Sequence, residues 1–254
     1  MLTFTIVSSR IVESVEKEKK YVAYTLRVEL RGSPESPKKD LDPVLIERRY
    51  TQFADLYNAL KKDFPDMIGA ISFPRKIVMG NFEPNLIAER SEAFRQLLYL
   101  ITSELRLREP SAVVAFLQNP ELEEARKLIA EKNYEKALDI LEISFKLLNK
   151  VYTDRSRIVM CSLCRVVACA AAGGLAARGE RWALLALRRY EGVSDSDLLL
   201  IYVPLLHTCV DIWDTLGLDK SKLVDEINRL QRRGMKTDSV PTLMEAVDGL
   251  SSMT

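Results

Sequence analysis

The sequence lacks an excess of charge of either sign, since its 254 residues hold 37 lysines and arginines against 36 aspartates and glutamates. No long-range positive field of the kind that draws proteins to nucleic acid is therefore expected, and an anion site must be local. Histidine is limited to His207, beside a threonine in an apolar run. A hydrogen-bonded core residue is a better interpretation of His207 than a catalytic base.

Cysteine is also scarce, and its four copies all lie in apolar helical stretches between residues 161 and 209. A secreted disulfide framework would be denser and would reach into loops. Cys161 and Cys164 have no second pair at zinc spacing, so buried thiols are expected, with no metal and no cofactor. The first ten residues alternate polar and apolar side chains, unlike a secretory signal. We expect a cytoplasmic protein, whose natural N-terminus can be longer than this one.

Long hydrophobic runs that would span a membrane are not expected either. Residues 158–177 are long enough, but Arg165 lies among them and would cost roughly 2.5 to 3.5 kcal/mol at the centre of a bilayer. Residues 198–210 are apolar but too few, and they include Pro204. Both runs are predicted to be buried helices.

The first part of the sequence has a pattern typical of strands followed by helices. Apolar and polar residues alternate before residue 50, which predicts antiparallel strands. From Thr51, which can cap a helix, the apolar spacing changes to i, i+3, i+4. The predicted strands are 2–6, 21–31 and 44–50, with a turn at 16–20 and a proline-containing loop at 31–43; the predicted helices are 51–64, 86–104 and 111–118.

The remainder has helical periodicity, and Asn119 and Pro120 make a plausible boundary before it. Three helix pairs of roughly 40 to 50 residues indicate a short helical-repeat array. The expected class is therefore α+β, with domains at 1–118 and 121–254. The pairs cover 121–150, 157–192 and 197–234, with turns at 131–134, Gly179 and Gly217, and the last twenty residues are expected to form a loosely held tail or a short helix.

Arg90 is the first candidate for a binding residue, because it lies on the apolar stripe of its predicted helix, between Ile87 and Phe94. An isolated buried charge is costly. Arg90 is therefore either in a buried ion pair, for which Glu47 is a candidate, or it opens onto an anion pocket.

Arg49, Tyr50 and Lys76 favour the pocket. The arginine fork can hold a phosphate bidentately, and a tyrosine ring can cover the apolar face of a sugar-like ring. Lys76 adds a cation on a segment stiffened by Pro74. Tyr50 can also be an ordinary core aromatic at the end of a strand.

Three motifs, "RRYTQF", "FPRK" and "AERSEAFRQLL", resemble in order and spacing those of the phox-homology (PX) domains, over about residues 1 to 118. The resemblance implies a PX fold that binds phosphatidylinositol 3-phosphate. Arg49 would hold the 3-phosphate, Tyr50 would stack on the inositol ring, and Lys76 would meet the 1-phosphate. Arg90 would hydrogen-bond the 4- and 5-hydroxyls, and Arg48 would have a supporting part.

The second half resembles the helical, tetratricopeptide-like domain of one branch of PX proteins, the sorting nexin twenty and sorting nexin twenty-one pair. The stretch "KNYEKALDILE" is similar to the turn and second-helix opening of that repeat. Glycines and a proline interrupt the region, so the unbroken heptads of a membrane-bending coiled coil are not expected.

Ile77, Val78 and Met79 follow Lys76 in a predicted loop, where they could enter a lipid layer or pack beneath the loop. Together with the resemblance, these features predict a non-enzymatic adaptor on early endosome membranes. Its helical domain would recruit a protein partner or membrane-protein cargo. The alternative is a protein-interaction scaffold that does not bind lipid and in which Arg49 and Arg90 form internal ion pairs.

Overall fold

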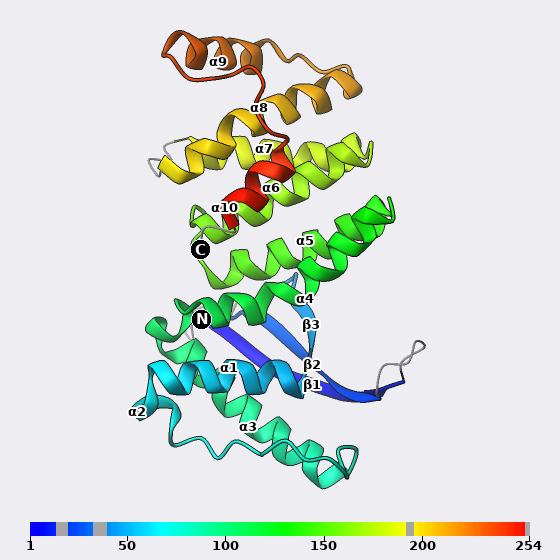
Figure 1. Cartoon of the computed structure of the whole chain (residues 1–254), viewed down its shortest axis with the longest axis vertical. Coiled ribbons are helices and arrows are strands. Elements are labelled where there is room, and N and C mark those ends of the chain that lie inside the picture. The colour runs from blue at the N-terminus through cyan, green and yellow to red at the C-terminus, as the bar shows by residue number, and fades with distance from the viewer. Residues whose placement is uncertain (14–19, 33–39, 192–195, 252–254) are drawn as a thin grey trace. The chain divides into compact units, whose positions relative to one another are not determined.

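A computed structural model describes the chain except for residues 14–19, 33–39, 192–195 and 252–254 (Figure 1). The turn expected at 16–20 and the loop expected at 31–43 lie largely outside the described residues. The chain divides into two compact units, Met1–Asn119 and Pro120–Thr254.

The first unit contains a three-stranded antiparallel sheet in the order β1-β2-β3 (Figure 1). The strands are β1 (Leu2–Val12), β2 (Tyr21–Leu30) and β3 (Val44–Arg49). Leu26 of β2 pairs with Ile6 on one side and Ile46 on the other; Leu26 and Ile46 are buried and Ile6 is partly buried. The expected α+β class is confirmed.

The helices that follow the sheet are α1 (Tyr50–Asp63), α2 (Pro65–Ile68), α3 (Pro84–Ser103), the 3₁₀ helix η1 (Leu105–Arg108) and α4 (Ser111–Ala130), of which α4 begins in the first unit and continues beyond Asn119. The prediction that Thr51 caps α1 is wrong, because the N-cap is Arg49. The Arg49 backbone N–H donates to Oε1 of Gln52 at 2.7 Å. This side chain satisfies the N-cap donor, so the helix starts directly at the end of β3.

Aromatic side chains hold α1 and α3 against the sheet. Phe53 of α1 stacks on Phe94 of α3 with ring centroids 3.8 Å apart, and Tyr24 of β2 meets Phe94 edge-on at 4.9 Å. All three rings are buried. This contact fixes the position of α3, and with it the position of Arg90, relative to the strands.

Helix α4 does not end before Asn119 as expected but continues through Pro120. A proline inside a helix removes the N–H that would bond to the carbonyl four residues earlier, here that of Phe116. Arg48, only 1% exposed, supplies a donor in its place: its Nε lies 2.6 Å from the Phe116 carbonyl oxygen, and its Nη2 also donates to the carbonyl oxygen of Leu117 at 3.0 Å. Because a buried guanidinium replaces the backbone donor, the helix tolerates the proline.

The second unit is a succession of helices, in which α5 packs on α6, α6 on α7, α7 on α8 and α8 on α9 (Figure 1). They are α5 (Tyr134–Val151), α6 (Arg157–Ala172), α7 (Ala176–Tyr190), α8 (Ser196–Leu216), α9 (Ser221–Arg232) and α10 (Leu243–Ser251). Helix α10 packs against α6 and α8, and it buries Leu243, Val247 and Leu250. The last twenty residues therefore include a docked short helix rather than only a loose tail.

The turn expected at Gly179 lies instead at Gly173 and Gly174, and Gly179 is inside α7. A Cβ atom on Gly179 would lie 2.9 Å from the Cβ of Ala170, and one on Gly173 would lie 2.4 Å from that of Tyr134. Both glycines are needed for close helix contact. The turn expected at Gly217 is confirmed, since this residue has φ +65° and follows α8.

Helix α8 continues on both sides of Pro204 for 21 residues and ends just before Gly217, as the third predicted helix pair requires. The segment Leu198–Leu216 of α8 is long and apolar enough to cross a membrane, but half of it is buried inside the protein. The core helix of a soluble unit meets the same test, so the segment is weak support for a membrane span.

Candidate functional site

Arg90 is buried on α3, with 2% of its surface exposed, and its charge has no acidic partner among the described residues. Glu47, the predicted partner, pairs with Arg10 through two contacts of 2.8 and 2.6 Å. The hydrogen bond from Arg10 lowers the pKa of Glu47. The predicted Arg90–Glu47 ion pair is therefore wrong.

The surroundings of Arg90 are aromatic and neutral. The guanidinium carbon lies 4.0 Å from the centre of the Tyr50 ring, and Nη2 donates to Oδ1 of Asn81 at 3.0 Å. Within the described part of the chain, Arg90 Nε and the Tyr24 hydroxyl are buried without a hydrogen-bond partner. Burial raises the pKa of Tyr24, and the nearby Arg90 charge opposes this rise. Buried groups without partners are uncommon, which makes this region a candidate for ligand binding.

Tyr50 is the first residue of α1 and is held in one orientation. Its hydroxyl donates to the Pro74 carbonyl oxygen at 2.7 Å, and its ring centre lies 6.0 Å from that of Phe73. Burial raises the pKa of Tyr50, while the Arg90 charge acts in the opposite direction. The ring thus joins α3 to the segment that carries Lys76.

Lys76 is exposed and lies with Tyr50 on the wall of an open cavity of about 440 Å³. The cavity lies between α1 and residues 73–76. Its wall carries Lys61 and Arg75 as further cations and Asp55 as the one acidic group among the described lining residues. The side chains give this cavity a net positive charge.

Arg49, at the end of β3, is exposed and has its guanidinium carbon 3.6 Å from the centre of the Tyr21 ring. It is not among the described residues that line the cavity. The structure therefore brings Tyr50 together with Arg90 and with Lys76, and it places Arg49 on an aromatic ring of β2.

The loop between Lys76 and α3 exposes apolar side chains. Val78 is 97% exposed and Met79 84%, so neither packs beneath the loop, while Ile77 is partly covered. Gly80 has φ +80°, and Nδ2 of Asn81 donates to the Ile77 carbonyl oxygen at 2.9 Å, which closes a turn. Sequence reasoning did not select Asn81; the Gly-Asn pair, typical of turns, was the available signal.

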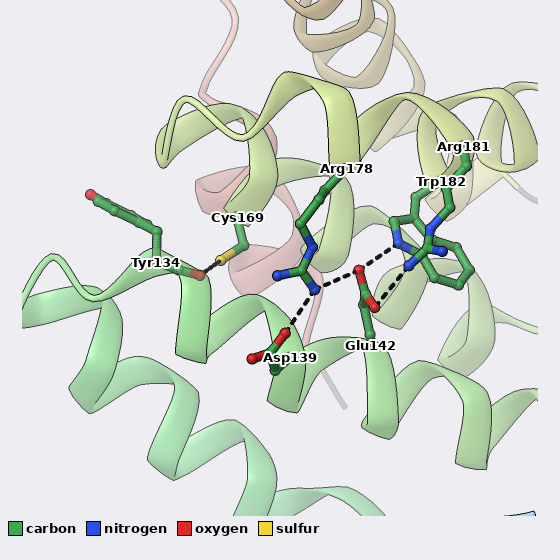
Figure 2. Close-up of polar contacts among 7 residues, drawn as sticks. All are labelled: Tyr134, Asp139, Glu142, Cys169, Arg178, Arg181 and Trp182. Atoms are coloured by element: carbon green, nitrogen blue, oxygen red, sulfur yellow. Dashed lines mark hydrogen bonds and ion pairs between the residues drawn. The ribbon is translucent and has the colours of Figure 1, made fainter.

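In the second unit, a buried acidic side chain joins two helices that are not consecutive (Figure 2). Glu142 of α5, whose side chain is 12% exposed, accepts hydrogen bonds from α7 side chains: Arg178 at 3.2 Å, Arg181 at 3.0 Å and Trp182 Nε1 at 2.9 Å. Arg178 also contacts Asp139 at 2.7 Å. All three donors bond to one carboxylate, which indicates a structural role for Glu142. Sequence reasoning missed this cluster.

His207 and the four cysteines lie in the environments expected of structural residues. The Nε2 atom of His207 donates to the Thr237 carbonyl oxygen at 2.9 Å. The four cysteines are buried and in no disulfide, and burial raises the pKa of Cys169 to about 11 and that of Cys209 to about 12. The described residues contain no group of three or more histidine, cysteine or acidic side chains that could hold a metal ion.

Comparisons with known proteins give a consistent result. A family model described as the PX domain matches residues 36–120. Human sorting nexin-21 is 31% identical over 248 residues, which cover 96% of this chain and 63% of that protein. Bovine sorting nexin-20 is 32% identical over 236 residues, which cover 91% of this chain and 70% of that protein. The chain spans about two thirds of the length of these curated relatives.

Two further matches cover less of the chain. The rat serine/threonine-protein kinase Sgk3 is 33% identical over 107 residues, which cover 42% of this chain and 19% of the kinase. Among solved structures, the mouse SNX19 PX domain with bound sulphate ion covers 46% of this chain and 95% of its own, at 16% identity and a TM-score of 0.35.

Proposed function

The chain belongs to the sorting nexins that carry a PX domain, and from this premise we propose that it is a non-enzymatic adaptor that binds phosphatidylinositol 3-phosphate and a protein partner. The lipid is assigned to the N-terminal unit. The partner, or a membrane-protein cargo, is assigned to the helical unit. The expected location is the cytoplasmic face of early endosome membranes.

The observation that supports lipid binding best is the buried charge of Arg90, which has no acidic partner among the residues that the structure describes. Burying an ion costs roughly several kcal/mol unless a partner of opposite charge offsets this cost. The Tyr50 ring and the Asn81 amide offset part of this cost, but they do not neutralise the charge. A polar headgroup would supply the missing acceptors.

Each proposed contact is the one that the resemblance to PX domains implies, and the chemistry of its side chain suits it. Arg90 would donate to the 4- and 5-hydroxyls, and Tyr50 would stack on the inositol ring. Lys76 would meet the 1-phosphate. Arg49 would exchange the Tyr21 ring for the 3-phosphate, since a dianionic phosphate attracts a guanidinium more strongly than a ring does. Val78 and Met79 would enter the lipid layer, with Ile77 at its edge.

The helical unit is proposed to recruit protein because successively packed helices present long surfaces to a partner. Weak lipid binding and weak partner binding reinforce each other when both act on one membrane, because each raises the effective concentration for the other.

Sedimentation with liposomes tests the lipid proposal. The full chain should sediment with vesicles that contain phosphatidylinositol 3-phosphate and much less with vesicles of unphosphorylated phosphatidylinositol. Arg49→Ala should lose most of this binding, whereas Arg27→Ala, an exposed arginine on β2, should retain it. Undiminished binding by Arg49→Ala, or none by the wild type, would support the lipid-independent scaffold instead.

A further inference from the structure

Asn81, in the turn before α3, hydrogen-bonds to Arg90 through its side-chain oxygen. Its amide is oriented by two bonds of opposite sense: Nδ2 donates to the Ile77 carbonyl oxygen at 2.9 Å, and Oδ1 accepts from Arg90 Nη2 at 3.0 Å. Because a carbonyl oxygen can only accept, the Ile77 contact requires the nitrogen on that side. The oxygen of the amide therefore faces the guanidinium.

An amide at this position differs in effect from the carboxylate of nearly identical shape. An aspartate would form a buried ion pair with Arg90 and cancel its charge. Asn81 orients the guanidinium but does not neutralise it, and within the described residues Arg90 Nε has no hydrogen-bond partner. Beside Arg90 the turn thus places a neutral acceptor, Asn81 Oδ1, next to guanidinium donors.

This pairing of donors with an acceptor distinguishes between two groups that an inositol ring can carry. A hydroxyl can accept a hydrogen bond from Arg90 and donate one to Asn81 Oδ1 at the same time. A phosphate at neutral pH has almost only acceptor oxygens, so it cannot donate a hydrogen bond to Oδ1. Its negatively charged oxygens would instead lie against the amide oxygen of Asn81 and be repelled by it.

We propose that Asn81 is a specificity-determining residue, whose Oδ1 beside Arg90 makes this end of the site select inositol hydroxyls over additional phosphates. The inference rests on the proposed headgroup site. It assigns the discrimination against bisphosphorylated lipids to a single neutral acceptor rather than to a lack of positive charge. Arg90 without that acceptor would bind a phosphate readily.

Soluble headgroups provide the test, because Asn81 also holds the loop with Val78 and Met79, and a membrane assay would combine the two effects. Titration calorimetry on the full chain would compare inositol 1,3-bisphosphate with the 1,3,4- and 1,3,5-trisphosphates. The wild type should prefer the bisphosphate. In Asn81→Ala this preference should fall about tenfold, because the hydrogen bond that only a hydroxyl can donate to Oδ1 is lost. Asn85→Ala, at an exposed asparagine in the first turn of α3, should keep the wild-type ratio.

Asn81→Asp gives a second and opposite test. Its carboxylate should pair with Arg90, so that all headgroups bind at least about tenfold more weakly while the melting temperature stays at or above that of Asn81→Ala. A residue with only a structural role would lose stability and binding together. An unchanged preference in Asn81→Ala, or wild-type affinity in Asn81→Asp, would overturn the inference and leave the headgroup site intact. A wild type that binds none of the headgroups would overturn both.

Discussion

The exposed loop after Lys76 leads to a prediction whose size follows from the structure. Val78 is 97% exposed and Met79 84%, so nearly all of both side chains can be transferred from water to lipid. Full burial of such side chains contributes roughly 1.5 to 3 kcal/mol each, or about 3 to 6 kcal/mol for both. The double variant Val78→Asp, Met79→Asp removes this term and places two charges at the lipid surface. Since 1.4 kcal/mol is a factor of ten, vesicle affinity should fall by about 100-fold or more.

Two assays on the same protein separate insertion from headgroup recognition. Sedimentation with vesicles that contain phosphatidylinositol 3-phosphate should show the full loss. Calorimetry with soluble inositol 1,3-bisphosphate should show an affinity within about twofold of the wild type, because neither side chain is proposed to touch the headgroup. Leu105→Asp is a suitable control, since Leu105 is 69% exposed in the same unit but lies in η1 rather than in the loop.

Either of two results would refute this reasoning. An equal loss in both assays would mean that the aspartates disrupt the site and that the loop is structural. Unchanged vesicle binding would mean that the loop does not enter the membrane.

Three further predictions concern stability. Arg48→Met should lower the free energy of unfolding by about 3 kcal/mol or more, because it removes buried donors from three carbonyls; Arg48→Lys should not restore it in denaturant titrations, as a lysine lacks the planar fork, and a full rescue would disprove this role. Glu142→Ala should cost about 2 to 3 kcal/mol in thermal unfolding, whereas a loss no larger than that of the exposed Glu135→Ala would show that its three donors bind water equally well. The cysteines should react slowly with maleimide at pH 8 until denaturant is added, since burial holds the pKa of Cys209 at about 12; rapid labelling of the native protein would contradict their burial.

The same thiols give stability a pH dependence. Burial raises the pKa values of Cys169 and Cys209 in the folded protein, so their contribution to stability is fully present below the unfolded value of about 8.5 and declines as the pH rises toward the folded values. Unfolding measured between pH 8 and 10 should therefore show a loss of stability that a cysteine-free variant lacks.

Local sequence patterns were sufficient to predict those strands and helices whose formation depends only on their own residues. The alternation around Leu26 predicted β2, and the spacing of Phe53 and its neighbours predicted the body of α1. The start of α1 was missed because it depends on the Gln52 side chain, which propensity alone does not reveal. The course of α4 through Pro120 depends on Arg48, a residue about 70 positions earlier in the chain, so no local rule could predict it.

The candidate site was only partly predictable for the same reason. The spacing of the apolar residues predicted that Arg90 lies on the buried face of α3, and the structure confirms this. Whether its neighbour would be a carboxylate or an amide depended on the fold of a loop, and Glu47 was already paired with Arg10 across the sheet. Asn81 and Glu142 act through partners on other segments, which a single sequence does not identify.

The continuity of α4 has a practical consequence for dissecting this protein. A fragment that ends at residue 118 would cut the helix after eight of its twenty residues. It would also leave the Phe116 and Leu117 carbonyls, to which Arg48 donates, in a fraying last turn. A stable lipid-binding fragment should instead run to about residue 130, and failure of the shorter one to fold would say nothing about its affinity for phosphoinositides.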